Sequence, residues 1–434
     1  MRSPQWSIPI QSRSERLPIL HAIAFTVLFN SLIIVIFALL FVTFPLRAVS
    51  RRFSVWHQRV GKGLFGQCLV SITTLFFGQL DFVISTDSSD RSVEHRIERN
   101  AGTGEIVKVK VPKRSIWIAN HQTLADWLFL WTFFYVTDSS PSLYIALKSS
   151  LKKIPIIGQA CSWFGFAFLE RNWSKDKVNF EEQLDAMARD CTIEGTDGKL
   201  DFLLFPEGTI VTENTRGISS KFAEKANLKD FNYTLLPRST GLFFALRQLA
   251  VRVPSLELTD LTVGYPLPRT QTSTPLYPSE FYSLPSIFIH KVPPPELHFH
   301  LRFFRLGDIP LGDLSALKSR GKGQGDDGSE QEKKIFDAWL LERWQEKDDL
   351  LRRFNQTGSF MVNEGGRRQV ESDDEADEDR AKGEYVWKPR LRSPVWESLQ
   401  DRGSSQARFL QLAGQGRKRW MWVWQDERRR SQRT

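Results

Sequence analysis

Two side chains within residues 120–127 have the types that acid–base chemistry requires. The imidazole of His121 titrates near neutrality, and the carboxylate of Asp126 could fix its tautomer and stabilise the imidazolium. A separation of five residues would place the two side chains about 140° apart around one helix, so they cannot share a helical face. We therefore expect His121 in the turn before a helix, with its ring reaching back to Asp126 in the first helical turn and Asn120 or Thr123 available as the cap.

Two more polar segments interrupt the apolar sequence downstream. Residues 165–171 read Gly-Phe-Ala-Phe-Leu-Glu-Arg, and residues 205–209 read Phe-Pro-Glu-Gly-Thr. The guanidinium of Arg171 can pair with a phosphate through two hydrogen bonds. Gly208 would let the backbone approach an anion closely. Glu207 cannot attract a phosphate, so we expect it to orient Arg171 or to bind a substrate hydroxyl.

Each of these polar segments follows an expected strand. Residues 115–119 form a short buried strand before His121, residues 164–169 lead to Arg171, and residues 200–205 lead into Phe-Pro-Glu-Gly-Thr. Further strands are expected over 106–111, 143–147, 261–265 and 297–303, and helices over 175–191 and 242–251. This alternation predicts an α/β sheet. Because such sheets bind ligands at strand ends, we expect the motifs to share one site.

A long apolar segment near the N-terminus predicts a membrane anchor. After a polar N-terminus (1–16), residues 17–46 are nearly all apolar, and about 20 such residues cross the hydrocarbon core of a bilayer. More cations follow this segment than precede it, which favours a cytosolic C-terminal side. A second apolar segment, 63–84, contains Gln67 and Gln79, so it could span, re-enter or lie on the membrane surface.

The order, spacing and types of these residues resemble the glycerolipid acyltransferase family. The similarity extends from about Trp117 to Phe304 and includes Asn-His-x4-Asp-Trp, Gly-x-x-Phe-Leu-x-Arg and Phe-Pro-Glu-Gly-Thr. Within the family the chain looks most like the lysocardiolipin and lysophosphatidylinositol acyltransferase branch, through residues 126–131, 170–173, 212–214, 236–241 and 296–300. Many family members carry an aliphatic residue at the position of Arg238. An arginine is usual there in the branch named, which is consistent with a bulky anionic headgroup.

The resemblance implies both a fold and a reaction. It implies a mixed sheet flanked by helices, the glycerolipid acyltransferase fold, over residues 90–310, behind the N-terminal membrane-anchoring helical region. The implied reaction moves an acyl group from acyl-CoA to a hydroxyl of lysophosphatidate, lysophosphatidylinositol or lysocardiolipin, in phospholipid biosynthesis or remodelling. His121 would be the general base of the His-x4-Asp motif, and Asp126 would hold its ring.

The resemblance also assigns binding residues and a location. Positions matching Arg171, Glu207 and Gly208 hold the glycerophosphate in the family, and we add Thr209 and Arg238 to these substrate-binding candidates. Acyl-CoA is expected as a co-substrate, with no bound cofactor or metal. Candidates for its phosphates are Lys148, Lys152 and Lys153, although a solvated basic face explains these lysines equally well. Acyl-CoA is cytosolic, so we expect an endoplasmic reticulum protein whose domain faces the cytosol and whose segment 63–84 does not span.

The sequence after the domain divides into three parts. Residues 330–356 have the apolar spacing of an amphipathic helix. Residues 357–416 contain an acidic block that cannot bury a core, so this tail is expected to be disordered. Residues 417–424 mix cations with tryptophans, as a segment at a membrane interface would.

Composition excludes several other classes. Lys and Arg number 59 against 50 Asp and Glu, a net charge of +9 that suits an anionic membrane better than nucleic acid, because the chain has a long apolar segment and no nucleic-acid motif. Three cysteines imply neither a disulfide framework nor a thiolate metal site. His298 and His300 share one face of an expected strand, but no carboxylate or cysteine partner is evident, so a structural role is expected. The sequence does not indicate an oligomeric state.

Two other functions use the same residues differently. A CoA-independent transacylase resembling tafazzin would keep the His–Asp pair and would not require added acyl-CoA. A non-catalytic membrane protein would bind anionic lipid through its basic and tryptophan-containing segments. The intact His121, Asp126, Arg171 and Glu207 argue against this second alternative.

Overall fold

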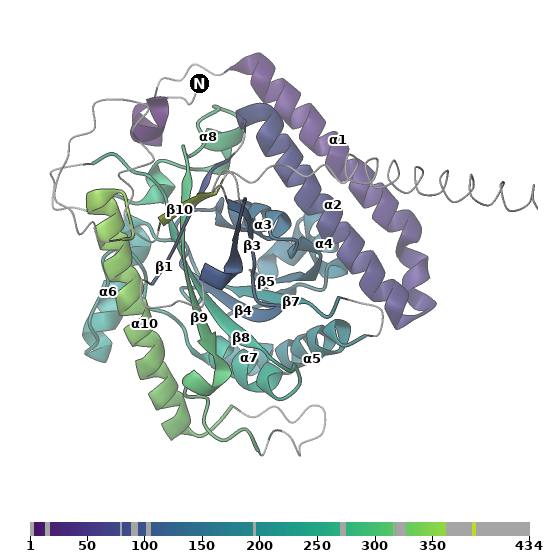
Figure 1. The fold of residues 1–434 in the computed structure, drawn as a ribbon, viewed down its shortest axis with the longest axis vertical. Coiled ribbons are helices and arrows are strands. Elements are labelled where there is room, and N and C mark those ends of the chain that lie inside the picture. Colours follow the sequence, from purple (N-terminus) through teal and green to yellow (C-terminus); the bar gives the residue numbers. More distant parts are fainter. Residues whose placement is uncertain are drawn as a thin grey trace, which may run out of the picture. The chain divides into compact units, whose positions relative to one another are not determined.

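A mixed eight-stranded sheet forms the centre of the computed structural model (Figure 1), in the order β10-β1-β9-β8-β4-β7-β5-β6. The strands are β1 (Phe82–Thr86), β4 (Arg114–Ala119), β5 (Leu143–Lys148), β6 (Ala167–Leu169), β7 (Leu200–Leu204), β8 (Glu257–Gly264), β9 (Leu297–Arg305) and β10 (Glu384–Trp387). From β8 to β6 all neighbours are parallel, whereas β9 runs antiparallel to β8 and β10 antiparallel to β1. The predicted mixed sheet flanked by helices is confirmed.

The structure describes residues 4–13, 18–78, 80–87, 94–100, 106–193, 197–269, 275–315, 317, 327–361 and 384–387. The chain divides into two units, residues 1–389 and 390–434, and the second unit lies entirely outside the described residues. The acidic block and the predicted interfacial segment 417–424 also lie outside them. Residues 384–387, predicted within a disordered tail, instead form β10, where the aromatic side chain of Trp387 is buried.

Helices cover both faces of the sheet. Along β4, Trp117 and Ala119 point into the apolar layer beneath α2 (Arg51–Phe77) and α3 (Asp126–Val136). Ile116 and Ile118, which alternate with them, point into the opposite layer beneath the other helices. The helices of that second layer are α5 (Trp173–Cys191), α7 (Thr240–Ala250) and α10 (Glu330–Thr357). α10 corresponds to the amphipathic helix predicted over 330–356.

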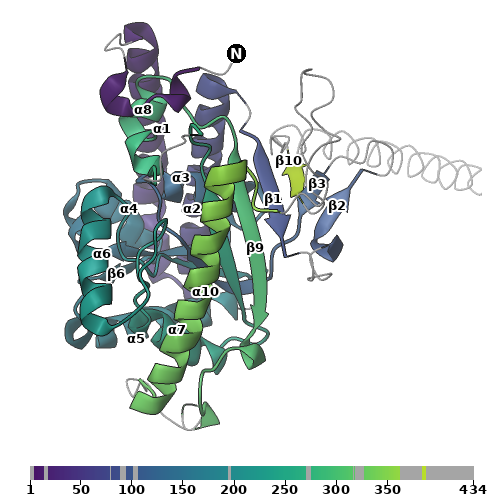
Figure 2. The ribbon, with the colours of Figure 1, turned by 90° about the vertical axis from the view of Figure 1, so that its left-hand side faces the viewer.

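The smaller elements lie around this sandwich. β2 (Ile97–Arg99) and β3 (Ile106–Val109) form a separate two-stranded sheet, so the strand predicted over 106–111 does not join the central one. The short helices α4 (Ile157–Trp163) and α8 (Leu284–Phe288) follow β5 and precede β9. Figure 2 shows α4, β6 and α6 (Glu213–Ala226) together on the side opposite β2 and β3.

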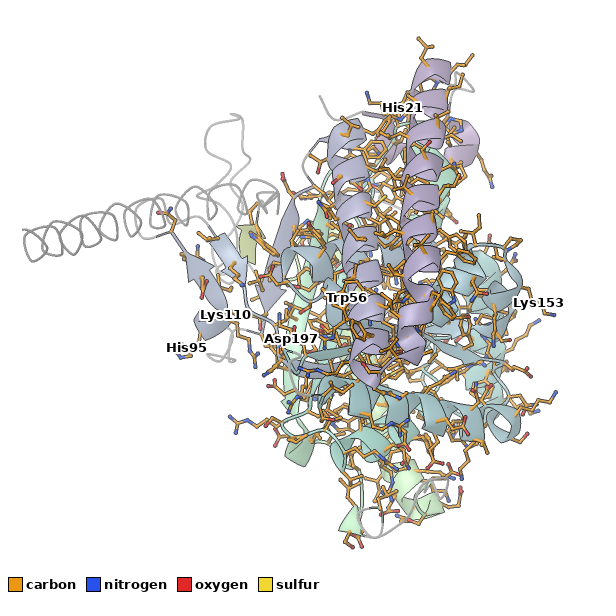
Figure 3. All side chains as sticks on the ribbon, turned by 90° about the vertical axis from the view of Figure 1, so that its right-hand side faces the viewer. His21, Trp56, His95, Lys110, Lys153 and Asp197 are labelled. Carbon is orange, nitrogen blue, oxygen red and sulfur yellow. The ribbon has the colours of Figure 1, made fainter. Side chains whose placement is uncertain are left out.

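The N-terminal region consists of two long helices that lie side by side (Figure 3). α1 (Ile19–Thr43) continues into a 3₁₀ turn to Ala48, and both α1 with this turn and α2 are long and apolar enough to cross a membrane. α1 exposes most of its apolar side chains, whereas α2 packs against α3 and buries nearly half of its most apolar stretch. This difference favours α1 as the element that contacts lipid, and the pair of helices favours association with a membrane.

The apolar segment predicted over 63–84 divides between two elements. Its first part is the end of α2, which stops at Phe77 before Gly78. Its last part enters β1, which pairs with β9 and β10 and is fully buried. A short apolar run suits a buried strand as well as a membrane segment, and periodicity alone does not separate the two. The sheet therefore extends beyond the predicted limits 90–310 on both sides.

Candidate functional site

His121 lies in the loop between β4 and α3, at the carboxyl end of the parallel strands. Its main chain is held on both sides by the segment that follows β7. The His121 amide donates to Glu207 Oε1 at 3.1 Å, and the Val211 amide donates to the His121 carbonyl at 2.9 Å. The imidazole stacks on Phe205 with ring centroids 4.4 Å apart. The segment around Glu207, 86 residues further along the chain, thus positions His121.

The ring of His121 contacts Asp126, as the spacing predicted. Nδ1 of His121 lies 2.8 Å from Oδ2 of Asp126, which is the first residue of α3 and is fully buried. The same Oδ2 accepts the amides of Gln122 at 2.7 Å and Thr123 at 3.1 Å. Oδ1 accepts the hydroxyls of Thr123 at 3.2 Å and Tyr265 at 2.5 Å. Five donors therefore surround this carboxylate.

These contacts determine which nitrogen of His121 can accept a proton. The Asp126 carboxylate accepts hydrogen bonds and cannot donate them, so the neutral ring must carry its proton on Nδ1 and present a lone pair at Nε2. Burial raises the pKa of the Tyr265 hydroxyl well above its ordinary value, which keeps that hydroxyl a donor to Asp126. Nε2 has no hydrogen-bond partner among the described residues, and the side chain is 19% exposed. It can reach an incoming hydroxyl.

The expected caps of α3 are only partly right. Asn120 does not cap the helix, because its side chain donates to the Val263 carbonyl at 3.0 Å and accepts the Val263 amide at 2.7 Å. It joins the end of β4 to β8. The Thr123 hydroxyl accepts the amide of Ala125 at 3.0 Å, and the Asp126 carboxylate accepts the amides of Gln122 and Thr123. Asp126 therefore fixes the loop that precedes α3, and among the described residues no side chain accepts the amides of the first helical turn.

In the structure, Glu207 is buried and its described partners are two backbone amides, not Arg171. Its two oxygens accept backbone amides, that of His121 at Oε1 and that of Leu235 at Oε2, the latter at 3.0 Å. Both bonds are buried or nearly so, and Glu207 joins two loops on either side of the site. Burial raises the pKa of Glu207 to about 8, although the two amide hydrogen bonds act to lower it.

This shift predicts that Glu207 makes stability depend on pH. The carboxyl has an ordinary pKa of 4.5 when unfolded and about 8 when folded, so the folded state favours the protonated form. Its contribution is complete below pH 4.5 and is lost as the pH rises through 8. One pKa unit corresponds to about 1.4 kcal/mol, so we expect the wild type to lose at least about that much stability between pH 5 and 9. A Glu207→Gln variant should not show this loss.

Unfolding midpoints of both proteins in lipid nanodiscs, measured from pH 5 to pH 9, test this expectation. The wild-type curve should fall toward the variant curve as the pH rises. Parallel curves would show that Glu207 keeps one protonation state throughout.

Arg171 adopts a backbone conformation that the sequence does not suggest. Its φ is +65°, in the left-handed region that disfavours residues with a Cβ, directly after β6. Asp176, in the first turn of α5, accepts the amides on either side, Glu170 at 2.7 Å and Asn172 at 3.1 Å. This clamp holds the turn and leaves the guanidinium exposed. The arrangement repeats that of His121 and Asp126, in which a carboxylate five residues later holds the loop before a helix.

Arg238 lies beside Arg171 and over Gly208. Partial burial and then the positive charge of Arg238 lower the pKa of Arg171. The Arg238 amide donates to the Pro206 carbonyl at 2.8 Å, and a Cβ on Gly208 would lie 3.7 Å from Arg238 Nε. Gly208 has a φ of +72°, which glycine adopts freely. In the part of the chain that the structure describes, neither guanidinium has a carboxylate partner, so the two cations are available to an anion.

The remaining predicted residues divide between the site and the surface. Thr209 is half-buried in the loop after Gly208 and therefore belongs to the site region. Lys148 ends β5 opposite Leu169 of β6, while Lys152 and Lys153 lie in the following turn, and all three lysines are exposed. Figure 3 shows Lys153 at the periphery of the molecule. They share the carboxyl edge of the sheet with the site without contacting the His–Asp pair.

His298 and His300 have hydrogen-bonding partners within the protein. His298 Nε2 lies 3.0 Å from Glu296, and the two ring nitrogens of His300 lie 3.0 Å from Ser85 Oγ and 3.1 Å from Asp87. No group of three metal-ligating side chains occurs among the residues described. His300 thereby joins β9 to β1, whereas the partner of His298 lies just before β9 itself.

Sequence reasoning missed three residues that support the site, namely Tyr265, Asp176 and Asp348. Asp348, on α10, accepts the amides of residues 232–234 at 2.7–3.1 Å to Oδ1, just before the Leu235 amide that binds Glu207. The available signal for Asp176 was a carboxylate in the first turn of a helix, as at Asp126. Tyr265 and Asp348 lie far from their partners in sequence, and nothing in the local pattern points to them.

The fold and the site together define an α/β domain with a His–Asp pair at the carboxyl edge of its sheet. Beside this pair lie two arginines for which the described residues provide no carboxylate partner. Residues 103–265 match the protein family described as Acyltransferase. Over this segment the chain is similar to the glycerolipid acyltransferase family.

Individual relatives support the same assignment. The chain is 35% identical over 275 residues to the 2-acyl-1-lysophosphatidylinositol acyltransferase of Saccharomyces cerevisiae, covering 57% of this chain and 63% of that protein. It is 34% identical over 253 residues to lysocardiolipin acyltransferase 1 of Gallus gallus, covering 58% and 57%. The matches span about three fifths of the length of these relatives.

A solved structure also matches. The 1-acyl-sn-glycerophosphate (LPA) acyltransferase PlsC from Thermotoga maritima aligns with a TM-score of 0.37 and 13% identity, covering 76% of this chain and 96% of that chain.

Proposed function

We propose that the protein is a membrane-bound acyltransferase that moves an acyl group from acyl-CoA to a hydroxyl of a lysophospholipid. The observation that carries the proposal is Nε2 of His121, which has no hydrogen-bond partner among the described residues and is fixed by Asp126. The same site contains the guanidiniums of Arg171 and Arg238, which have no carboxylate partner in that part of the chain. A base beside a phosphate-binding pair of cations suits an acceptor that carries both a hydroxyl and a phosphate.

In the proposed reaction, His121 acts as a general base. Nε2 removes the proton of the acceptor hydroxyl while the oxygen attacks the thioester carbonyl carbon of acyl-CoA. The tetrahedral intermediate then collapses, its carbon–sulfur bond breaks, and the imidazolium returns the proton to the departing sulfur. A thiol leaves readily, so no acyl-enzyme is required. Asp126 keeps its charge throughout and stabilises the imidazolium between the two proton transfers.

Arg171 and Arg238 would hold the acceptor phosphate. Partial burial and, after it, repulsion from Arg238 lower the pKa of Arg171, and a phosphate between the two guanidiniums would relieve the repulsion. The left-handed backbone of Arg171, held by Asp176, presents this side chain before substrate arrives. Glu207 and Gly208 act through the loop: the first fixes the amide of His121, and the second supplies the left-handed backbone of the turn beside Arg238.

The relatives point to the acceptor class and the location. Their names specify lysophosphatidylinositol and lysocardiolipin, both of which carry a phosphate next to a bulky headgroup. We propose an acceptor of this kind and an endoplasmic reticulum membrane with the domain on the cytosolic side, where acyl-CoA is found.

Purified full-length protein in nanodiscs, supplied with labelled acyl-CoA and a panel of lysolipids, tests this function. Lysophosphatidate, lysophosphatidylinositol and monolysocardiolipin should be acylated, and omission of acyl-CoA should abolish product. Transfer from a phospholipid donor without acyl-CoA would instead establish a CoA-independent transacylase. No transfer under either condition would leave a lipid-binding protein.

The acceptor-phosphate interaction predicts a selective kinetic effect of Arg171→Ala. We expect the KM for phosphate-containing acceptors to rise at least about tenfold, because a charge-assisted hydrogen bond contributes about 1.5–3 kcal/mol. Monoacylglycerol, which has no phosphate, should be used equally well by variant and wild type. Arg189→Ala removes an exposed arginine of α5 and serves as the control. An equal rise in KM for both acceptors would contradict the phosphate assignment.

A further inference from the structure

α6 (Glu213–Ala226) begins directly after the loop that follows β7 and contacts His121. The Val211 amide donates to the carbonyl of His121, and the next residue, Thr212, caps the helix through a reciprocal pair of bonds with Thr215. This Thr-x-x-Thr capping box explains why the polar residues 213–216 are helical. The helix is therefore tied to the main chain of the proposed base.

One side of α6 is fixed to the domain. Ser219 accepts the amide of Leu236 at 3.2 Å, Ala223 is buried, and Arg216 forms an ion pair with Asp230 at 2.6 Å. These three residues lie on the same helical face. Because they lock the rotation of the helix, the opposite face has a defined direction toward the surroundings.

That opposite face is apolar and flanked by cations. Ile218 and Phe222, one turn apart, are 70% and 59% exposed, and no described segment covers them. Lys221 and Lys225 are exposed beside them. Single exposed apolar residues are ordinary on a protein surface. An apolar pair bordered by lysines is the pattern of a helix that lies in the interface of an anionic membrane.

A second exposed apolar group lies on the same side of the molecule. Ile154, Ile156 and Ile157, between the turn after β5 and α4, are 41%, 42% and 53% exposed, and Lys152 and Lys153 precede them. Figure 2 shows α4 and α6 on this common side. Both groups therefore combine exposed apolar side chains with lysines near the carboxyl edge that holds the site.

We propose that α6 is an interfacial helix that inserts Ile218 and Phe222 into the surface of an anionic bilayer, at the entrance of the site. The positive charges of Lys221 and Lys225 complement the anionic lipid headgroups. The apolar helix α1, already described, would anchor the protein in the same membrane. A lysophospholipid could then pass from the bilayer to His121 without its acyl chain crossing water. This consequence rests on the proposed function, whereas the membrane contact itself does not.

Depth measurements on full-length protein in vesicles of phosphatidylcholine and phosphatidylserine test the contact directly. Nitroxide labels are attached to Ile218→Cys or Phe222→Cys in a Cys161→Ala background, in which the other cysteines, Cys68 and Cys191, are buried. Glu224→Cys is the matched control, exposed on the same helix about 120° from Ile218. Labels at 218 and 222 should be relaxed more by oxygen than by a water-soluble nickel chelate, and the label at 224 should show the reverse. Equal accessibility to the chelate at the three positions would overturn the proposal.

A kinetic measurement gives an independent readout. The double variant Ile218→Ser, Phe222→Ser should raise the KM for a long-chain lysolipid in vesicles about tenfold, since both apolar contacts are lost. Turnover of a short-chain, water-soluble acceptor should stay unchanged, which also shows that the variant folds. An unchanged KM in vesicles would count against the interfacial role. If no acceptor is acylated, the proposed function fails while the depth measurement still decides the membrane contact.

Discussion

Substitution of His121 by alanine is expected to lower kcat by about 100- to 10,000-fold, the range that a positioned general base contributes. The main-chain bonds of residue 121 to Glu207 and Val211 do not involve its side chain, so the loop should keep its place. Only the imidazole and its stacking on Phe205 are lost. Substrate KM should change little, because the phosphate-binding arginines are untouched.

The test is a comparison of initial rates with saturating acyl-CoA and the preferred lysolipid, together with thermal unfolding. Asp126→Asn is the companion variant. An amide in place of the carboxylate must turn its NH2 group toward donors, since five donors converge there, and the ring would lose its fixed tautomer. Both variants should lose activity. Wild-type turnover by a folded His121→Ala protein would refute the assigned base.

Removal of the carboxylate at Asp260 is expected to cost about 3–5 kcal/mol of folding stability, the range found when one partner of a buried ion pair is deleted. Asp260 is fully buried in β8 and pairs with Lys347 and Arg302, both almost completely buried. Burial alone would raise the pKa of Asp260, but the two cations lower it, so the carboxylate is charged when folded. Without it, the hydrogen-bond acceptors left to Lys347 among the described residues are the Leu261 carbonyl and the Thr262 hydroxyl.

The unfolding free energies of Asp260→Asn, Lys347→Met and the double variant measure this interaction as a cycle. The double variant should recover part of the loss, because it removes the buried cation together with its partner. Additive losses would show that the pair has no coupling. The site should respond too, since Lys347 adjoins Asp348, which holds the loop leading to Glu207.

The sequence was most informative where chemistry and local geometry coincide. A separation of five residues excluded a shared helical face and predicted that His121 would reach back to Asp126, and the structure has this contact. Strand ends were also predictable, because buried apolar runs stop at polar motifs. The role of Glu207 was not predictable, since its two partners are backbone amides, one of them 28 residues away. Because every residue except proline has a backbone amide, the sequence does not indicate which amides a carboxylate will bind.

The other incorrect structural predictions concern segments whose composition suits two different environments. The apolar run ending in β1 fits a membrane as well as a sheet interior, and only the pairing of Phe82–Thr86 with β9 decides between them. Likewise, polar residues 213–216 suit either a loop or a capped helix. The left-handed backbone of Arg171 could not be anticipated, because it depends on Asp176 accepting both neighbouring amides.

The bonds from α10 to the site set a minimum length for an autonomous fragment. The recognised family segment stops at residue 265, yet Asp348 organises the peptide amides of 232–234 that precede the Glu207 bridge. A fragment trimmed at the family boundary would contain the whole His-x4-Asp motif and still lack the helix that keeps its surroundings in order. A break before this helix therefore separates His121 and Asp126 from that support.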